Sequence, residues 1–212
     1  MKLNKYRLFL VAAFAAVWIW AAINPVFPSD WRLENILTVI FLPIIYYGGK
    51  KYKFNNVSYT VITIFLILHT IGSHYTYAEV PIGFWIQEQV NGARNMYDRI
   101  VHFAFGLLIT YPIWQAFKRQ LNLSKGFWMY YIPVDIVLAS SAIYEILEWG
   151  SATFVSPEMG TAFLGAQGDI WDAQKDMLLA GIGAVLVMTL LYIKHRHFHT
   201  TIPSATTVDK SV

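Results

Sequence analysis

The sequence predicts an all-α membrane protein, a polytopic bundle of six transmembrane helices with both termini in the cytoplasm. Of its 212 residues, 56% are hydrophobic and only 14% are charged, whereas soluble domains are about a quarter charged. Six apolar stretches approach the length of roughly 20 residues that a helical span needs. The basic residues gather in the segments that join these stretches at one side only.

The six predicted spans cover residues 8–23, 33–47, 57–74, 98–117, 127–149 and 172–194. The second is short and contains Pro43, which a membrane helix tolerates when neighbouring helices satisfy the freed backbone groups. Aromatic residues make up 17% of the chain, as expected for a protein that lies across two membrane–water interfaces. There is no cysteine, so disulfides and thiolate metal sites are excluded.

The distribution of Lys and Arg sets the orientation. Four segments (the N-terminus, the loops after spans two and four, and the C-terminal tail) carry twelve of the 16 basic residues: Lys2, Lys5, Arg7, Lys50, Lys51, Lys53, Lys118, Arg119, Lys125, Lys194, Arg196 and Lys210. Cytoplasmic segments of membrane proteins are enriched in such residues, so both termini are expected in the cytoplasm. We expect residues 1–199 to form one transmembrane domain and residues 200–212 a disordered tail.

An alternative for the first apolar stretch is a cleaved signal peptide, because it follows a basic start and contains small residues. The residues at its end, Ile23, Asn24 and Pro25, make a poor cleavage site. We therefore expect a retained first span.

The acidic residues lie mainly toward the side opposite the lysines. Those at or near the outer face are Asp30, Glu34, Glu79, Glu88, Asp98, Glu145, Glu148, Glu158, Asp169, Asp172 and Asp176. Asp135 lies within the fifth predicted span and Asp209 on the cytoplasmic side. Acidic residues contribute little to topology, so their distribution carries independent information about chemistry.

Helical spacing places several of these acids on common faces. Arg94, Asp98 and His102 follow each other at intervals of four, Glu145 and Glu148 lie three apart, and Asp169, Asp172 and Asp176 follow at three and four. Such spacings form stripes along a helix. At about 1.5 Å per residue, three predicted helices bring acids and a histidine to a similar depth, and this is the main indication of a site.

Structural roles compete with a functional one. Asp169 and Asp172 open a helix and are suited to capping it, Asp98 could pair with Arg94 or Arg99, and His69 and His102 could be interior histidines. Glu145, Glu148 and Asp176 are different, because they lie a turn or more inside their spans. A lone carboxylate at such depth is costly unless it is protonated, paired or bound to a metal.

The counter-charge could be an arginine, Lys175, a proton or a metal ion. Histidine and carboxylates projecting between helices form known sites for divalent cations, and we expect the metal ligands to be His102, Glu148, Asp172 and Asp176. The candidate catalytic residues are Asp98, His102, Glu145, Glu148, Asp172 and Asp176, and the candidate substrate-binding residues are Arg94, Arg99, Lys175 and His74. No standard hydrolase signature such as HExxH or GxSxG is present.

At NMYDRIVHF, YEILEW and GDIWDAQKDMLLAGIGA the chain resembles the YjdF-like bacterial inner-membrane proteins, over essentially all six predicted spans. The resemblance implies a multi-pass protein of the cytoplasmic membrane and supplies no catalytic residues. More distantly, the acid-then-Asp layout resembles the VanZ-like membrane proteins, although Ala180 stands where those usually have Asn.

Three function classes remain open. The first is a metal-assisted membrane hydrolase or transferase acting on a lipid or envelope substrate. The second is a non-enzymatic scaffold whose outer charges form a partner surface, and the third is a small ion-coupled transporter. The third requires polar residues through the middle of several spans, where only Asp135 stands out. The expected partner is the lipid bilayer rather than nucleic acid, and the oligomeric state stays open.

Overall fold

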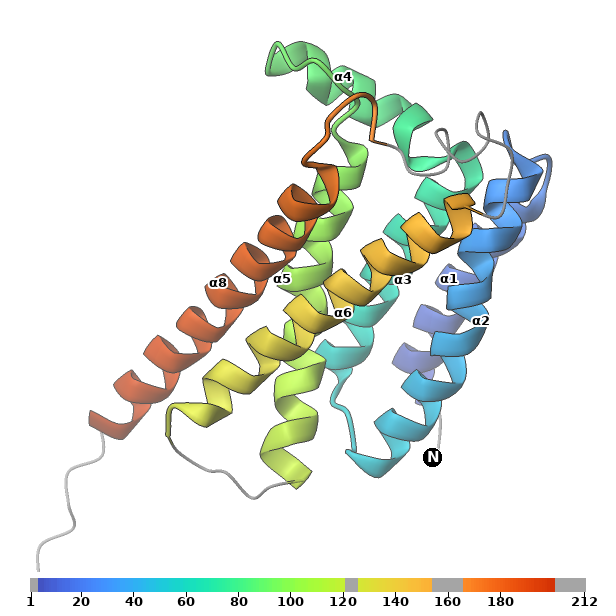
Figure 1. Cartoon of the computed structure of the whole chain (residues 1–212). Coiled ribbons are helices and arrows are strands. Elements are labelled where there is room, and N and C mark those ends of the chain that lie inside the picture. Colours follow the sequence, from blue (N-terminus) through green and yellow to red (C-terminus); the bar gives the residue numbers. More distant parts are fainter. Residues whose placement is uncertain (1–3, 121–125, 154–165, 201–212) are drawn as a thin grey trace, which may run out of the picture.

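A computed structural model describes residues 4–120, 126–153 and 166–200 (Figure 1). This part of the chain contains seven α-helices, one short 3-10 helix and no strand, which confirms the all-α prediction. The predicted tail from residue 201 onward lies outside the described residues, as do Lys2, Lys125, Glu158, Asp209 and Lys210.

The helices follow the predicted spans with local extensions. Their bounds are α1 (Lys5–Ala22), α2 (Pro28–Lys51), α3 (Asn56–Tyr75), η1 (Tyr77–Glu79), α4 (Pro81–Gln89), α5 (Tyr97–Gln120), α6 (Trp128–Thr153) and α8 (Asp172–Thr200). The side chains of Asn4 and Asn55 accept hydrogen bonds from backbone N–H groups and cap α1 and α3. The short helix α4, which was not predicted, begins with Pro81 at a position where proline is favoured.

Five of these helices are long and apolar enough to cross a membrane: α1, α3, α5, α6 and residues Asp172–Arg196 of α8. The remaining long helix, α2, has 24 residues, which corresponds to about 36 Å. Its apolar centre lies between Asp30 and Glu34 at one end and Lys50 and Lys51 at the other.

The long helices run roughly alongside one another, and α4 lies at one end of the bundle (Figure 1). At this α4 end, α1, α3 and α6 finish while α2, α5 and α8 begin. The opposite end holds the start of α1 and the last turns of α2, α5 and α8, so Lys5, Lys51, Lys118 and Lys194 lie at the same end of the bundle. This arrangement confirms that the basic segments of the described chain are grouped together.

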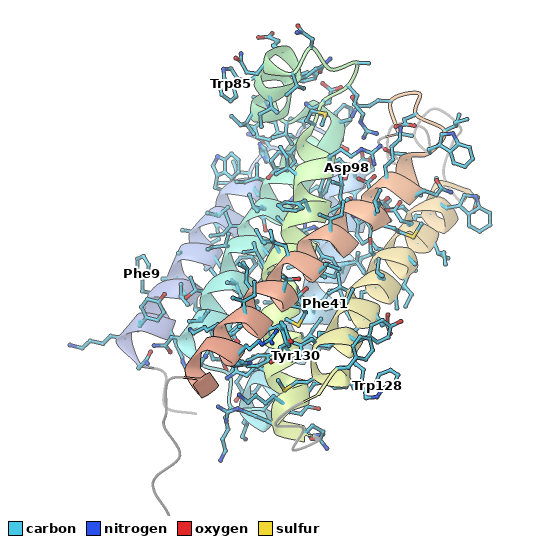
Figure 2. The ribbon with its side chains drawn as sticks, turned by 90° about the vertical axis from the view of Figure 1, so that its left-hand side faces the viewer. Phe9, Phe41, Trp85, Asp98, Trp128 and Tyr130 are labelled. Carbon is cyan, nitrogen blue, oxygen red and sulfur yellow. The ribbon has the colours of Figure 1, made fainter. Side chains whose placement is uncertain are left out.

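Much of the outward surface of the bundle is apolar. Phe9 on α1 and Trp128 on α6 are 65% and 61% exposed, and both lie on the outside of the bundle in Figure 2. Asp98, in contrast, is buried in the half of the bundle nearer to α4 (Figure 2). Apolar side chains outside and an acid inside are the arrangement expected for a bundle surrounded by lipid.

Helices α5 and α8 share the most extensive helix–helix contact of the described chain. A Cβ atom on Gly106 of α5 would lie 1.9 Å from the carbonyl oxygen of Ala180, and one on Gly183 of α8 would lie 2.5 Å from that of Phe103. Small residues allow such close backbone approach between membrane helices. The contact fixes the rotation of both helices and therefore points the acids of each toward the other.

Candidate functional site

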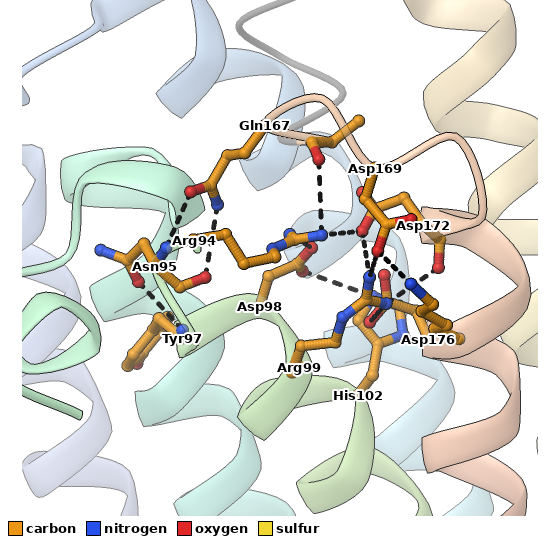
Figure 3. Close-up of polar contacts among 12 residues, drawn as sticks. Arg94, Asn95, Tyr97, Asp98, Arg99, His102, Gln167, Asp169, Asp172 and Asp176 are labelled. Carbon is orange, nitrogen blue, oxygen red and sulfur yellow. Dashed lines mark hydrogen bonds and ion pairs between the residues drawn. The ribbon is translucent and has the colours of Figure 1, made fainter. Parts of the chain in front are cut away.

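The segments that lead into α5 and α8 are tied together before either helix begins. Asn95 is fully buried, and its backbone N–H donates to the side-chain oxygen of Gln167 at 2.8 Å. The Gln167 amide donates back to the Asn95 carbonyl at 3.3 Å, as Figure 3 shows. The Asn95 side chain accepts from the Tyr97 N–H at 3.0 Å and donates to the Val80 carbonyl at 2.9 Å. One asparagine thus connects the entrances of α4, α5 and α8.

Arg99 of α5 binds a row of aspartates at the start of α8. Its Nη2 atom lies 3.1 Å from Asp169 Oδ2 and 2.6 Å from Asp172 Oδ1, and its Nη1 atom lies 2.7 Å from Asp176 Oδ1. Nη1 also donates to the Asp172 carbonyl at 2.9 Å. The guanidinium group is therefore the main charged link between the two helices.

Arg94 adds a second link and precedes the helix. It forms ion pairs with Asp172 and, at 3.4 Å, with Asp98. Because α5 begins at Tyr97, the predicted helical stripe is wrong at its first member. Of the two arginines considered as partners of Asp98, the described chain pairs it with Arg94. Asp172 contacts both arginines, so its side chain holds the network together rather than capping α8.

Lys175 lies at the exposed edge of this network. It is 52% exposed and its Nζ atom lies 2.6 Å from Asp169 Oδ2. This hydrogen bond, together with one from the Trp171 backbone N–H, lowers the pKa of the Asp169 carboxyl below its ordinary value.

A second group of side chains lies one turn further into the bundle. His102 Nε2 is 3.5 Å from Asp98 Oδ1 on its own helix and 3.5 Å from Glu145 Oε1 on α6. Asp98, His102 and Asp176 each offer one ligand atom, and these atoms lie within 4.8 Å of one another. All three residues are buried. This triad, which we call the cation site, has the residue types and the spacing needed to hold a metal ion.

The charges around the cation site do not balance among the described residues. Arg94, Arg99 and Lys175 face the five carboxylates of Asp98, Glu145, Asp169, Asp172 and Asp176. Asp176 Oδ1 forms an ion pair with Arg99, but the geometry of this contact is not that of a hydrogen bond. Glu145 Oε1 is buried and has no hydrogen-bond partner in the described chain. Buried carboxylates of this kind need further positive charge.

A further polar network adjoins the cation site and was not predicted. The Tyr144 hydroxyl donates to Glu34 Oε2 at 3.1 Å. His69 Nδ1 lies 2.6 Å from the Tyr77 hydroxyl, and His69 Nε2 lies 3.3 Å from the Glu34 carbonyl. The ring of Tyr144 packs edge-on against His102, with centroids 5.7 Å apart. The spacing of Asp30, Glu34 and Thr38, each four residues apart and all buried, is the sequence signal that could have revealed it.

The remaining predicted site residues are distributed as follows. Of the four predicted metal ligands, His102 and Asp176 belong to the cation site, with Asp98 as its third member. Asp172 instead pairs with Arg94 and Arg99. Glu148 lies beside Tyr144. His74 lies elsewhere, between α1 and α3, with Nδ1 3.0 Å from the Ala21 carbonyl and its ring against Trp20.

The known proteins that this chain resembles are described as membrane proteins, as its apolar helices would lead one to expect. Residues 6–197 match the family described as predicted membrane protein DUF2238. The chain is 32% identical over 161 residues to the inner membrane protein YjdF of Escherichia coli strain K12, which covers 76% of this chain and 77% of that protein. No solved structure matches the chain. With five helices apolar enough to cross a bilayer, the chain is an integral membrane protein and belongs to the DUF2238 family of predicted membrane proteins.

Proposed function

We propose that the chain is a six-span inner-membrane protein that binds a divalent metal ion near the periplasmic face and acts as a hydrolase or transferase on a lipid or envelope substrate. The inner-membrane location follows the relative YjdF, which is described as an inner membrane protein. The proximity of Asp98, His102 and Asp176 carries the metal part of the proposal.

The six-span topology requires α2 to cross the membrane alongside the five more apolar helices. Its length of 24 residues exceeds the roughly 20 that a span needs, and its basic end lies with the other basic helix ends. The positive-inside rule then assigns that end of the bundle to the cytoplasm. The cation site, near the α4 end, would face the periplasm.

The chemistry of the proposed reaction follows from the residues at the cation site. A divalent ion held there would polarise a carbonyl or phosphoryl oxygen of the substrate. Glu145, 3.5 Å from His102, is placed to take a proton from an attacking water or alcohol. The attacking oxygen would bond to the carbonyl carbon or phosphorus, and the departing oxygen would take up the proton that Glu145 releases.

A non-enzymatic scaffold is the main alternative, and one observation favours it. Arg99 lies 2.7 Å from Asp176 and 2.6 Å from Asp172, so arginines already neutralise part of the acidic cluster. In that case the carboxylates would hold α5 and α8 together and a proton would supply the missing charge. An ion-coupled transporter ranks lower, because it requires polar residues through the middle of several spans, where only Asp135 stands out.

Metal content separates the first two functions. The protein would be purified in detergent, incubated with Mn²⁺ or Zn²⁺ and passed through a desalting column, and its metal would be counted by mass spectrometry. We expect about one ion per chain for the wild type and less than a tenth of that for Asp176→Asn. Asp169→Asn is the matched control, since it makes the same change in a carboxylate outside the cation site.

The two outcomes have distinct meanings. Metal bound by the wild type and by Asp169→Asn but not by Asp176→Asn supports the proposal. A folded wild-type protein without metal, or equal binding by all three proteins, contradicts the metal-assisted function and supports the ion-pair scaffold.

The reaction itself is tested in vesicles of Escherichia coli polar lipids prepared in ¹⁸O-water. Hydrolysis would place ¹⁸O in the released product, whereas transfer would yield new lipid species without the label. If the metal-bound protein produces neither, the enzymatic part of the proposal is wrong.

A further inference from the structure

An apolar cavity of about 200 Å³ lies between α2, α3, α5 and α6. Its floor consists of buried side chains on α3 and α5, among them Ile62, Leu66 and Val101. His102 lines it as well, so the cavity shares one side chain with the cation site. The cavity therefore reaches the candidate chemistry from the interior of the bundle.

The lining changes in polarity along the axis of the bundle. Nearer to the α4 end it contains His69, Tyr77, His102 and Tyr144, and toward the opposite end it contains Ile45, Ile62 and Ile109. A ligand that fits this lining has a polar end and a hydrocarbon end, and its polar end lies beside the cation site.

Two hydroxyl groups on facing helices point to a ligand rather than to simple packing. Thr38 of α2 and Ser141 of α6 both line the cavity, are 2% and 1% exposed, and have hydroxyl oxygens without a hydrogen-bond partner in the described chain. Hydroxyls in helices commonly donate to the carbonyl four residues earlier, as Thr63 and Thr70 do here. Leaving a buried hydroxyl unpaired is costly, so an acceptor supplied by a ligand would satisfy these groups.

The mouth of the cavity faces the lipid side of the bundle. The lining residues Phe41 on α2 and Ile143 and Leu147 on α6 are 47%, 57% and 49% exposed. The backbones of α2 and α6 share no extensive contact. Side chains rather than a close helix–helix contact therefore separate the cavity from the surroundings at this mouth. Figure 2 shows Phe41 within the helical region of the bundle, between Asp98 and the end that carries Trp128.

We propose that the cavity binds the part of a membrane lipid's acyl chain that lies next to the ester group, and that this chain enters between α2 and α6. The hydrocarbon lies against Ile45, Ile62 and Ile109, and the ester group accepts hydrogen bonds from Thr38 and Ser141. The polar part of the lipid then lies beside His102. This inference rests on the proposed function and gives its substrate class as an acyl lipid, because the bilayer is the source of amphiphiles at such a mouth.

The test uses phosphatidylethanolamine with a photoreactive diazirine in the half of one acyl chain nearer to the ester group. The full chain is placed in nanodiscs of phosphatidylethanolamine and phosphatidylglycerol that contain a small fraction of the probe, irradiated, and digested for mass spectrometry. We expect labelling of the buried floor around Ile62 and Leu66, which lipids surrounding the bundle do not reach. Labelling confined to outward residues such as Phe9 would overturn the inference.

Cavity variants make the test specific. Ser141→Phe fills the cavity and should lower floor labelling at least tenfold, whereas Ile146→Phe on the same helix, at a residue that is 62% exposed and outside the cavity lining, should leave it unchanged. Thr38→Val and Ser141→Ala each remove one hydrogen bond and should weaken probe binding about fivefold. If tryptophan fluorescence shows that Ser141→Phe is unfolded, Ile45→Phe fills the other end.

Metal content measured on the same samples separates this inference from the proposed function. Ser141→Phe should lose floor labelling and keep its metal, while Asp176→Asn should lose metal and keep floor labelling. A metal-bound wild type without floor labelling overturns the lipid site alone. Floor labelling in a wild type without metal overturns the metal-assisted function and leaves the lipid site standing.

Discussion

The guanidinium group of Arg99 on α5 lies 2.7 Å from a carboxylate oxygen of Asp176 on α8, and both side chains are buried, with 8% and 2% exposed. This contact joins the two helices that carry the cation site. The same arginine stabilises the pairing of the two helices, and it would compete with the proposed metal ion for Asp176.

Replacing Arg99 should destabilise the protein strongly. Arg99→Met leaves Asp176 without its closest cation and leaves Asp172 with Arg94 alone among the described residues, and breaking a buried ion pair from one side costs about 3–5 kcal/mol. Lys175→Met is the control, since Lys175 is half exposed and exposed pairs contribute no more than about 1 kcal/mol. The free energy of unfolding in mixed micelles checks both, and equal losses would show that Arg99 has no special structural role.

The contact between α5 and α8 should be sensitive to a single methyl group. In Gly106→Ala the new Cβ would lie 1.9 Å from the Ala180 carbonyl oxygen, and such overpacking costs about 1–3 kcal/mol. In Gly150→Ala on α6 the new Cβ has nothing within 4 Å, so its thermal midpoint should not fall. A tolerated Gly106→Ala would mean that the two helices are further apart than described.

Acid should weaken the network through Asp169. Its pKa is lowered by the hydrogen bonds from Lys175 and the Trp171 backbone, so it stabilises the fold above its unfolded pKa of about 3.9, and this contribution is lost as the pH falls through the folded pKa. The wild type should be more stable than Asp169→Asn near neutral pH. In thermal melts, the difference in midpoint between the wild type and Asp169→Asn should disappear only at strongly acidic pH. A difference that grows as the pH falls would contradict the stabilising role of the Asp169 carboxylate.

The hydroxyl of Tyr144 should matter more than an exposed hydroxyl. Tyr144→Phe removes the donor 3.1 Å from Glu34 Oε2 and leaves a buried acceptor unpaired, which costs about 1–3 kcal/mol. Tyr6→Phe removes a hydrogen bond to Thr60 at an exposed position and should change the stability by less than about 1 kcal/mol. The free energies of unfolding of the two variants are measured under the same conditions. A larger loss for Tyr6→Phe than for Tyr144→Phe would contradict the role assigned to Tyr144.

The sequence was sufficient to predict the six long helices, though not α4, and the meeting of acids from three of them. Apolar stretches of span length have few alternative structures in a membrane, and the intervals of Asp172–Asp176 and Asp98–His102 are set by the helical repeat. The approach of these residues to Glu145 follows because α5, α6 and α8 all place them near the α4 end of the bundle.

The partners within the cluster could not be predicted, because they depend on the rotation and spacing of whole helices. Close packing of α5 and α8 at Gly106 and Gly183 brings Asp98 and Asp176 together. Glu34 was recognised as an outer acid, but its contact with Tyr144 requires knowing which face of α2 is buried. The cavity depends on the separation of α2 from α6, for which the sequence has no local signal.

Pulsed electron paramagnetic resonance of Mn²⁺ bound to the protein tests the cation site most directly, because it detects nitrogen atoms coordinated to the ion. We predict coupling to one imidazole nitrogen in the wild type and its loss in His102→Gln, while His74→Gln retains it. Bound Mn²⁺ without nitrogen coupling, or coupling that persists in His102→Gln, would contradict a metal site built from Asp98, His102 and Asp176.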